Sequence, residues 1–275
     1  YHYVYIDTML EKYIKIPKKL KKNQIDNFFK KKFGNSFIKL SKIEDVTETN
    51  PNKLKQKEIY RPNLEDLYRL FSFISLNKRT TVLEFGTGWS TLVMALAIKE
   101  NKKKYLHNIK GLRRKNPFEI HVVDCNKHFQ SISQKRIINF FKDPSFVKFT
   151  HSKCNIAKFN NQICNEYSKI PLVNPDFIYL DGPDQKDIQG SLNGINLRHN
   201  DFMPMNSDLL KIEPFLIPGT IIITDGRGAN AQFLKNNFVR KWEYFFDQKF
   251  DQHIFYLNEK TLGKINSNLL KFYFK

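Results

Sequence analysis

The sequence predicts an α/β fold, in which helices pack against a sheet of largely parallel strands. An apolar strand at 82–85 runs into two glycines and is followed at once by an apolar helical segment at 92–98. Two further apolar strands, 120–124 and 176–180, reach an aspartate at their carboxyl ends. Two strands separated by a short polar turn occupy 242–257. Parallel sheets bind ligands at the carboxyl ends of their strands, so the acids and glycines predict a shared cleft.

The two glycines that end the first strand are Gly86 and Gly88. Glycine permits positive φ and lets a ligand approach bare backbone, and the helix that follows presents unpaired N–H groups. We therefore expect a small-molecule pocket at Gly86, Thr87 and Gly88. The spacing excludes a dinucleotide fingerprint, which needs a third glycine where Thr91 stands, and a P-loop, which needs a lysine after the last glycine.

Chain length and cysteine content limit the class of protein. The 275 residues suffice for one large domain with an extension, which we divide into 1–61 and 62–275. Three cysteines without a C-x-x-C pair indicate neither a disulfide framework nor a structural zinc site. No apolar run approaches the roughly 20 residues of a membrane span. We therefore expect a soluble, cytoplasmic protein.

The net charge of +19 is concentrated in two segments. Residues 1–61 hold fifteen Lys or Arg against seven acids, and a predicted insertion at 99–116 holds eight against one. Of the 46 basic residues 37 are Lys, in a chain also rich in Asn, Ile and Phe, which indicates AT-rich coding at least as much as a binding surface. Solvated lysines are therefore the favoured interpretation, with nucleic acid or an anionic membrane surface as the alternative partner.

Aromatic and basic residues alternate in the extension at 18–22 and 28–33. Such interleaving suits docking on nucleic acid or an anionic bilayer. We favour a basic N-terminal helical extension whose lysines face water. Its apolar side chains would pack on the main domain: Ile25, Phe28, Phe29 and Phe33. A turn at 50–52 is expected as the hinge before that domain.

The main domain is expected to open with a helix after Asn63, a preferred N-cap residue. Asp66 follows three positions later, where a capping box would place an acid. Tyr60 and Arg61 precede this helix within reach of the cleft, although a surface position is the simpler expectation for the arginine.

The pattern Glu84-x-Gly86-x-Gly88-x-Ser90 resembles the first motif of class I S-adenosylmethionine-dependent methyltransferases, E/D-x-G-x-G-x-G. Serine replaces the last glycine, which is compatible with the motif if Ser90 caps the helix. The resemblance implies S-adenosylmethionine as the cofactor. It also implies a cofactor site that includes Glu84, Gly86, Thr87, Gly88 and Ser90.

Asp124 ends the second strand, where a carboxylate can accept hydrogen bonds from both ribose hydroxyls. It follows Glu84 by forty residues, about twice the spacing that is usual in the family. The insertion at 99–116 explains the excess if it loops out, and if ordered it is expected near the nucleotide end of the site. A third strand is predicted at 146–150, after which Asn155 is expected to bind the adenine amino group, as the resemblance implies.

The stretch around Asp181, D-F-I-x-L-D-G, resembles the fourth motif of the family, in the form typical of small-molecule O-methyltransferases. We expect Asp181 to contact cofactor, metal or substrate. After a long connection at 207–216, a fifth strand ends at Asp225. In the metal-dependent branch, acids at these two ends and a following asparagine hold a divalent cation. Gly226 replaces that asparagine, so a magnesium ion is considered but not favoured.

The strands 242–246 and 253–257 form a tight hairpin and must be antiparallel. They supply the reversed last strand of the resembled family, and the matches span 62–258. The resemblance thus implies a doubly wound, Rossmann-like, mostly parallel sheet of seven strands with an antiparallel last strand.

Methyl transfer needs a nucleophile held in line with the methyl group and a base that removes a proton. The candidate bases are Asp181, Asp225 and His199. The candidate substrate-fixing residues are Arg198, Arg227 and Asn230.

The acceptor is expected to be an oxygen of a small hydroxylated molecule or a saccharide. An RNA or DNA methyltransferase that grips its substrate with the basic extension is an alternative, although the N-P-P-Y type of motif is absent. A binding protein that keeps the fold without turnover is another, against which the intact Glu84, Gly86, Gly88 and Asp124 argue.

Overall fold

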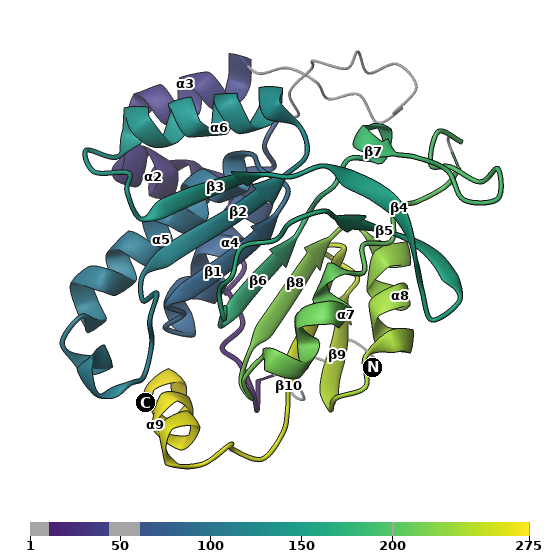
Figure 1. Ribbon diagram of the computed structural model, residues 1–275. Coiled ribbons are helices and arrows are strands. Elements are labelled where there is room, and N and C mark those ends of the chain that lie inside the picture. Colours follow the sequence, from purple (N-terminus) through teal and green to yellow (C-terminus); the bar gives the residue numbers. More distant parts are fainter. Residues whose placement is uncertain (1–10, 44–60, 200, 275) are drawn as a thin grey trace.

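A seven-stranded sheet forms the centre of the computed structural model, which describes residues 11–43, 61–199 and 201–274 (Figure 1). Its strands are β1 (Thr81–Phe85), β2 (Glu119–Asp124), β3 (Val147–His151), β6 (Phe177–Leu180), β8 (Ile221–Asp225), β9 (Trp242–Asp247) and β10 (Gln252–Leu257). Their order is β3-β2-β1-β6-β8-β10-β9, and β10 alone runs antiparallel to its neighbours β8 and β9. The predicted mostly parallel sheet with a reversed last strand is confirmed.

Helices cover both faces of this sheet, as a doubly wound fold requires (Figure 1). One face carries α2 (Lys22–Phe33), α3 (Asn35–Ile43), α4 (Leu64–Leu76), α5 (Trp89–Tyr105) and α6 (Lys127–Phe140). The other carries α7 (Asp208–Ile212) and α8 (Gly228–Asn237), while α9 (Lys264–Phe274) lies beside the far end of α5. The connection expected at 207–216 thus holds α7 and the 3₁₀ turn η3 (Glu213–Phe215). Among the described residues, no helix is both long and apolar enough to cross a bilayer.

Alternation along the strands divides the core between the two faces. Val82 packs into the apolar cluster with α4 and α5, whereas Leu83 and Phe85 pack into the cluster with α7 and α8. Successive side chains of a strand point to opposite faces, so a strand buried on both sides reads as a continuous apolar run. That is why the central strands were recognisable from the sequence.

A small second sheet is absent from the sequence-based prediction; two of its strands follow β3 and the third follows β6. It consists of β4 (Cys154–Phe159), β5 (Gln162–Tyr167) and β7 (Ile188–Gln189). Asn160 and Asn161 form the tip of the β4–β5 hairpin with φ of 46° and 62°. Asparagine tolerates this left-handed region better than other non-glycine residues, so an Asn-Asn pair between apolar segments was the available signal.

The extension packs on the main domain through the aromatic face of α2, as predicted. Phe28 lies edge-on to Tyr68 and Phe71 of α4, with ring centroids 5.1 and 4.9 Å apart. Phe29 is fully buried. Lys32 differs from the solvated lysines around it because it is half-buried and pairs with Glu100 of α5. The hinge expected at 50–52 lies outside the described residues.

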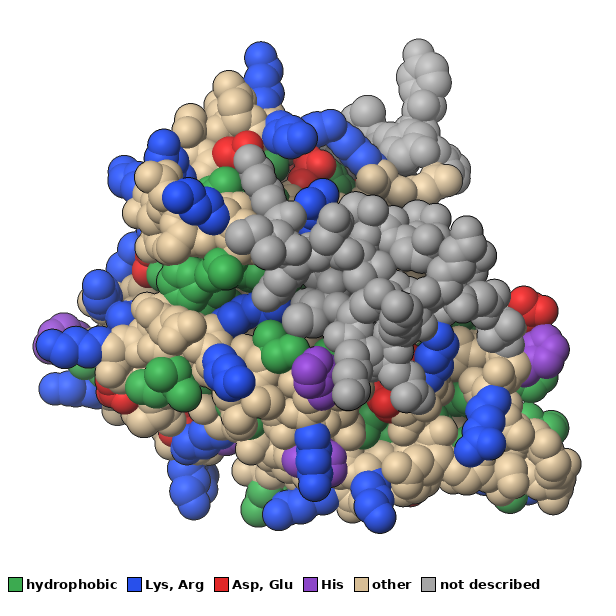
Figure 2. Space-filling model, turned by 90° about the horizontal axis from the view of Figure 1, so that it is seen from above, with side chains coloured by type: hydrophobic (Ala, Val, Ile, Leu, Met, Phe, Trp, Pro, Cys, Tyr) green, Lys and Arg blue, Asp and Glu red, His purple; other side chains and the backbone are tan. Residues whose placement is uncertain are grey.

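The basic segment 99–116 is ordered, and its expected position near the nucleotide end of the site is wrong. Residues 99–105 complete α5, and the 3₁₀ turn η1 (Asn108–Gly111) follows. Because α5 returns antiparallel to β1, this segment reaches the amino edge of the sheet, opposite the carboxyl ends (Figure 1). Viewed from above, Lys and Arg side chains are spread around the visible surface (Figure 2).

A buried aspartate fixes the amino ends of the two central strands. Asp176, just before β6, accepts hydrogen bonds from the backbone N–H groups of Thr80 and Thr81 at 2.9–3.0 Å. The Tyr273 hydroxyl of α9 donates to it at 2.7 Å, and Arg114 lies 3.7 Å away. These contacts align β6 with β1 and anchor α9.

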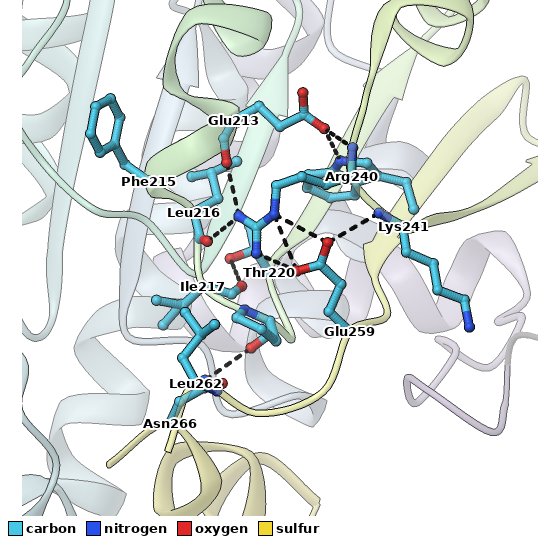
Figure 3. Close-up of polar contacts among 12 residues, drawn as sticks. Glu213, Phe215, Leu216, Ile217, Thr220, Arg240, Lys241, Glu259, Leu262 and Asn266 are labelled. Carbon is cyan, nitrogen blue, oxygen red and sulfur yellow. Dashed lines mark hydrogen bonds and ion pairs between the residues drawn. The ribbon is translucent and has the colours of Figure 1, made fainter. Parts of the chain in front are cut away.

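A second polar network joins η3 to the start of β9 (Figure 3). Glu213, 2% exposed, accepts hydrogen bonds from the Arg240 backbone N–H and the Trp242 indole, each at 2.9 Å. The Arg240 guanidinium donates to the carbonyls of Glu213 and Leu216. It also pairs with Glu259. Buried donors and acceptors here satisfy one another, so losing one member leaves others unpaired.

We predict that Glu213→Ala lowers the free energy of unfolding by roughly 2–5 kcal/mol, because buried N–H groups lose their acceptor. Lys241→Ala is the matched control: only its backbone N–H joins the network, and its side chain points away (Figure 3). That variant should change stability by less than about 0.5 kcal/mol. Urea unfolding of the three proteins checks this, and equal stabilities would contradict it.

Candidate functional site

The ends of β1 and β6 meet through two glycines. A Cβ on Gly86 would lie 2.9 Å from the Gly182 nitrogen, and a Cβ on Gly182 would lie 2.5 Å from the Gly86 Cα. Gly86 also has φ of 93°, whereas Gly88 has an extended φ of −177° that any residue adopts. The expected positive φ is therefore used at Gly86 only. This close backbone approach brings Thr87 and Asp181 to the same cleft.

Glu84 joins β1 to the first turn of α5. It is fully buried and accepts hydrogen bonds from the hydroxyls of Ser90 at 2.5 Å and Thr91 at 2.6 Å. Burial raises the pKa of Glu84 to about 8, and these hydroxyls oppose the shift. The expected cap at Ser90 is wrong, because Gly88 is the N-cap and the Ser90 hydroxyl is held by Glu84. Glu84 thus shapes the turn from beneath it.

Two adjoining cavities lie at the carboxyl ends of the parallel strands. The first lies between the starts of α4 and α5 and one side of α6. The second extends from the end of β2 to the start of α8. Residues common to both linings are Thr87, Phe129, Asp181 and Asp225. The strand-end residues predicted as a cluster are thus largely brought together.

Asp124 lines the second cavity at the end of β2. Its Oδ1 accepts a hydrogen bond from the Asn126 backbone N–H at 2.7 Å, and the Cys125 backbone N–H also stabilises the ionised carboxylate. A carboxylate has about four acceptor positions, so these contacts do not use all of them. Burial raises the pKa of Asp124 to about 7, and Asp187 and Asp181 add to the shift. The group therefore changes charge near neutral pH.

Three carboxylates line the first cavity: Asp66, Asp181 and Asp225. Burial raises the pKa of Asp66 to about 6 and that of Asp225 to about 8, and the charge of Asp66 adds to the shift at Asp225. Loss of hydration also raises the pKa of Asp181, which Arg227 opposes from 3.7 Å away. Within the part of the chain that the structure describes, no group of three or more His, Cys, Asp or Glu is arranged to hold a metal ion.

Arg227 and Asn230 line the second cavity from the start of α8. Arg227 donates to the carbonyls of Asp181 and Pro183, so it braces the loop after β6. Asn230 is 1% exposed. Its Oδ1 accepts a hydrogen bond from the Asn206 N–H, and its Nδ2 donates one to the Asn206 carbonyl. These contacts hold the cavity wall. They also use many of the hydrogen-bonding groups of Arg227 and Asn230, which we expected to bind the substrate.

Besides the buried Glu84, three predicted site residues lie away from the cavity linings. Asn155 lies in β4 and donates to the Ser168 hydroxyl at 2.9 Å. His199 is largely exposed, and its ring lies against that of Phe202 with centroids 4.7 Å apart and the planes tilted by 35°. Arg198 is exposed in the same connection. Their roles in adenine binding, base catalysis and substrate binding stay predictions.

Sequence reasoning missed several lining residues on helices. Asp66, expected only as a helix-capping acid, faces the first cavity. Arg61, which precedes α4 and was placed within reach of the cleft, also lines this cavity. Trp89 and Arg136 form another part of that wall, with the guanidinium 4.3 Å from the indole centroid. Asp66 was overlooked because its position three residues after the Asn63 cap already explained it as a capping residue. Arg136 was overlooked because no sequence motif around it indicates a site.

No protein-family model matches the chain, and neither does any curated protein. Among solved structures, it is similar to the SAH-bound methyltransferase PaMTH1 of Podospora anserina, at 11% identity over 90% of this chain and 100% of that one, with a TM-score of 0.45. It is similar to the O-methyltransferase of Bacillus cereus in complex with SAH, at 11% identity, coverages of 93% and 97%, and a TM-score of 0.41. It is also similar to the O-methyltransferase TomG of Streptomyces achromogenes in complex with SAM, at 9% identity, coverages of 84% and 99%, and a TM-score of 0.41. At these values the likeness assigns neither a family nor an activity to this chain.

Proposed function

We propose that the chain is an S-adenosylmethionine-dependent methyltransferase that acts on an oxygen of a small hydroxylated molecule or a saccharide. The observation that carries the proposal is the single cleft shared by Thr87, Asp124 and Asp181, at the carboxyl ends of β1, β2 and β6. A glycine turn, a ribose-binding acid and a third strand-end acid are what such a cofactor requires of the protein.

Asp124 is proposed to accept hydrogen bonds from the ribose hydroxyls of the cofactor. Its burial and its partial use by Asn126 support this role, because the carboxylate is fixed but not saturated. The first cavity suits the amino-acid tail, since Arg61 and Arg136 can face a carboxylate and Asp66 an ammonium. S-adenosylmethionine supplies a methyl group that its sulfonium already activates.

Asp225 is proposed as the base that takes the acceptor proton, with Asp181 beside it. A base works best when its pKa lies near the working pH, and burial raises that of Asp225 to about 8. Asp225 lines both cavities, so one carboxylate can face acceptor and cofactor together. His199 stays an alternative base. The apolar and amide groups at the far end of the second cavity support a small acceptor: Met203, Pro204, Ala229 and Asn230.

We predict that Asp124→Ala weakens binding of S-adenosylhomocysteine by roughly 1–3 kcal/mol, through loss of hydrogen bonds to a charged acceptor. Asp143→Ala is the control, because Asp143 is an exposed acid on the loop after α6, away from both cavities. Calorimetry with the three proteins measures the effect. Equal affinities in all three would remove Asp124 from the cofactor site.

The same binding should depend on pH. Because the pKa of Asp124 is raised to about 7, the carboxylate is ionised above that pH and protonated below it. Only the ionised form accepts from both hydroxyls, so affinity should rise about tenfold between pH 6 and pH 8. Asp124→Asn should bind weakly with little pH dependence. A wild-type affinity that is flat across this range would contradict the assignment.

Methyl transfer is predicted to survive chelation. Asp181 and Asp225 lack the third ligand of the metal-dependent branch, since Gly226 has no side chain. Transfer of a labelled methyl group to a panel of polyols, sugars and phenols should proceed equally with and without a chelator. Loss of transfer with the chelator and its return with Mg²⁺ would instead establish a shared cation that stabilises the alkoxide.

A further inference from the structure

Gln252 lies directly opposite Asp225 in the antiparallel pair of β10 and β8. It is fully buried, and its Oε1 accepts a hydrogen bond from Arg69 Nε at 2.8 Å. Arg69 comes from α4, which also supplies Asp66 to the first cavity. The Gln252 side-chain amide therefore links β10 to α4 next to Asp225.

Arg69 is held firmly on its other sides. Its Nη2 donates to Asp247 at 2.6 Å, and its guanidinium carbon lies 3.7 Å from the Phe250 ring centroid. The side chain is 3% exposed, so this stacked ion pair has little freedom to swing. A fixed guanidinium that donates only hydrogen bonds dictates which end of the Gln252 amide faces it.

The orientation of the amide follows from this contact. Because the oxygen of Gln252 faces Arg69, its NH₂ group faces the other way. Nε2 has no hydrogen-bond partner among the described residues, and a buried unpaired donor is unfavourable. Asp225 is the residue directly opposite on β8, and its carboxylate can accept from this NH₂ group. Gln252 lowers the pKa of Asp225 against the effect of burial.

The surroundings of Asp225 otherwise favour its protonated form. Asp66 of α4, Asp181 after β6 and Asp251 in the turn before β10 all raise the pKa of Asp225. Arg69 carries the opposing charge, but Asp247 partly neutralises it. The Tyr179 hydroxyl of β6 lies 3.5 Å from the Asp225 Oδ2, which is a long contact. The Tyr179 hydroxyl and the Gln252 amide, which lies opposite Asp225 in the strand pair, are thus the neutral donors on this side of the carboxylate.

We propose that Gln252, fixed by Arg69, is a positioning residue that donates its amide to ionised Asp225 and aims that carboxylate into the cleft. The use of Asp225 as a base rests on the proposed function. The contact itself does not require turnover, so it is tested separately.

The pH dependence of stability reports this contact. The folded pKa of Asp225, about 8, is above its ordinary value of 3.8, so the stability that this group contributes is present below pH 4 and is lost as pH rises toward 8. A donor that favours the ionised form reduces that loss. Removing the donor should therefore destabilise the protein more at pH 9 than at pH 5.

The experiment compares the Tm at pH 5 and at pH 9 of four full-length proteins: the wild type, Gln252→Met, Asp225→Asn and the double variant. We expect the Tm loss caused by Gln252→Met to be larger at pH 9 than at pH 5, by roughly 3 °C or more. In the Asp225→Asn background the loss should be the same at both pH values. If Gln252→Met lowers the Tm of the chain that keeps Asp225 equally at pH 5 and pH 9, then Gln252 has a structural role only. That result would overturn the proposal.

Phe255→Leu is the control, because Phe255 is a fully buried residue of the same strand that pairs with Ile222 instead. Its effect should not change with the residue at 225. If Gln252→Met does not fold, Gln252→Asn keeps the polarity and shortens the amide, and the same pH comparison applies. S-adenosylhomocysteine binding by the wild-type chain is measured in parallel: a pH-coupled Tm loss without nucleotide binding would keep the contact and reject the proposed function.

Discussion

The close approach of Gly86 and Gly182 is the constraint on which the candidate site depends. A side chain at either position would overlap the other backbone, so the loops after β1 and β6 would have to separate. Their separation would move Asp181 away from the turn before α5. The turn is fixed from below by Glu84, whose carboxylate holds two hydroxyls of that helix. Backbone contact and buried hydrogen bonds thus set the geometry before any ligand binds.

The cleft is rich in acids although the chain is strongly basic. Desolvation is the largest cause of the raised pKa of Asp66, Asp124 and Asp225, and neighbouring acids add to it. Exposed charges more than about 8–10 Å away are largely screened by salt. The net charge of +19 therefore says little about the cleft. Local burial decides its proton affinities.

The sequence predicted the parts of this structure that have a local pattern. The central strands are apolar runs, and Asp124, Asp181 and Asp225 stand at or just after their carboxyl ends, so topology alone gathers these acids. Asp66 and Gln252 were not predicted as site residues, because each faces Asp225 only through the packing of α4 and β10 on β8. The second sheet was missed because its hairpin interrupts the expected alternation of strands and helices.

The same distinction applies to the basic segments. The aromatic face of α2 is buried against α4, so the residues most suited to stacking on nucleic acid already serve the core. Lys32 pairs with Glu100 and lies 5.7 Å from two phenylalanine rings, which ties part of the charge to the fold. The segment 99–116 lies at the amino edge of the sheet, while the cavities open at the carboxyl edge. A polyanion bound at the amino edge would therefore lie at the opposite end of the strands from the cavities.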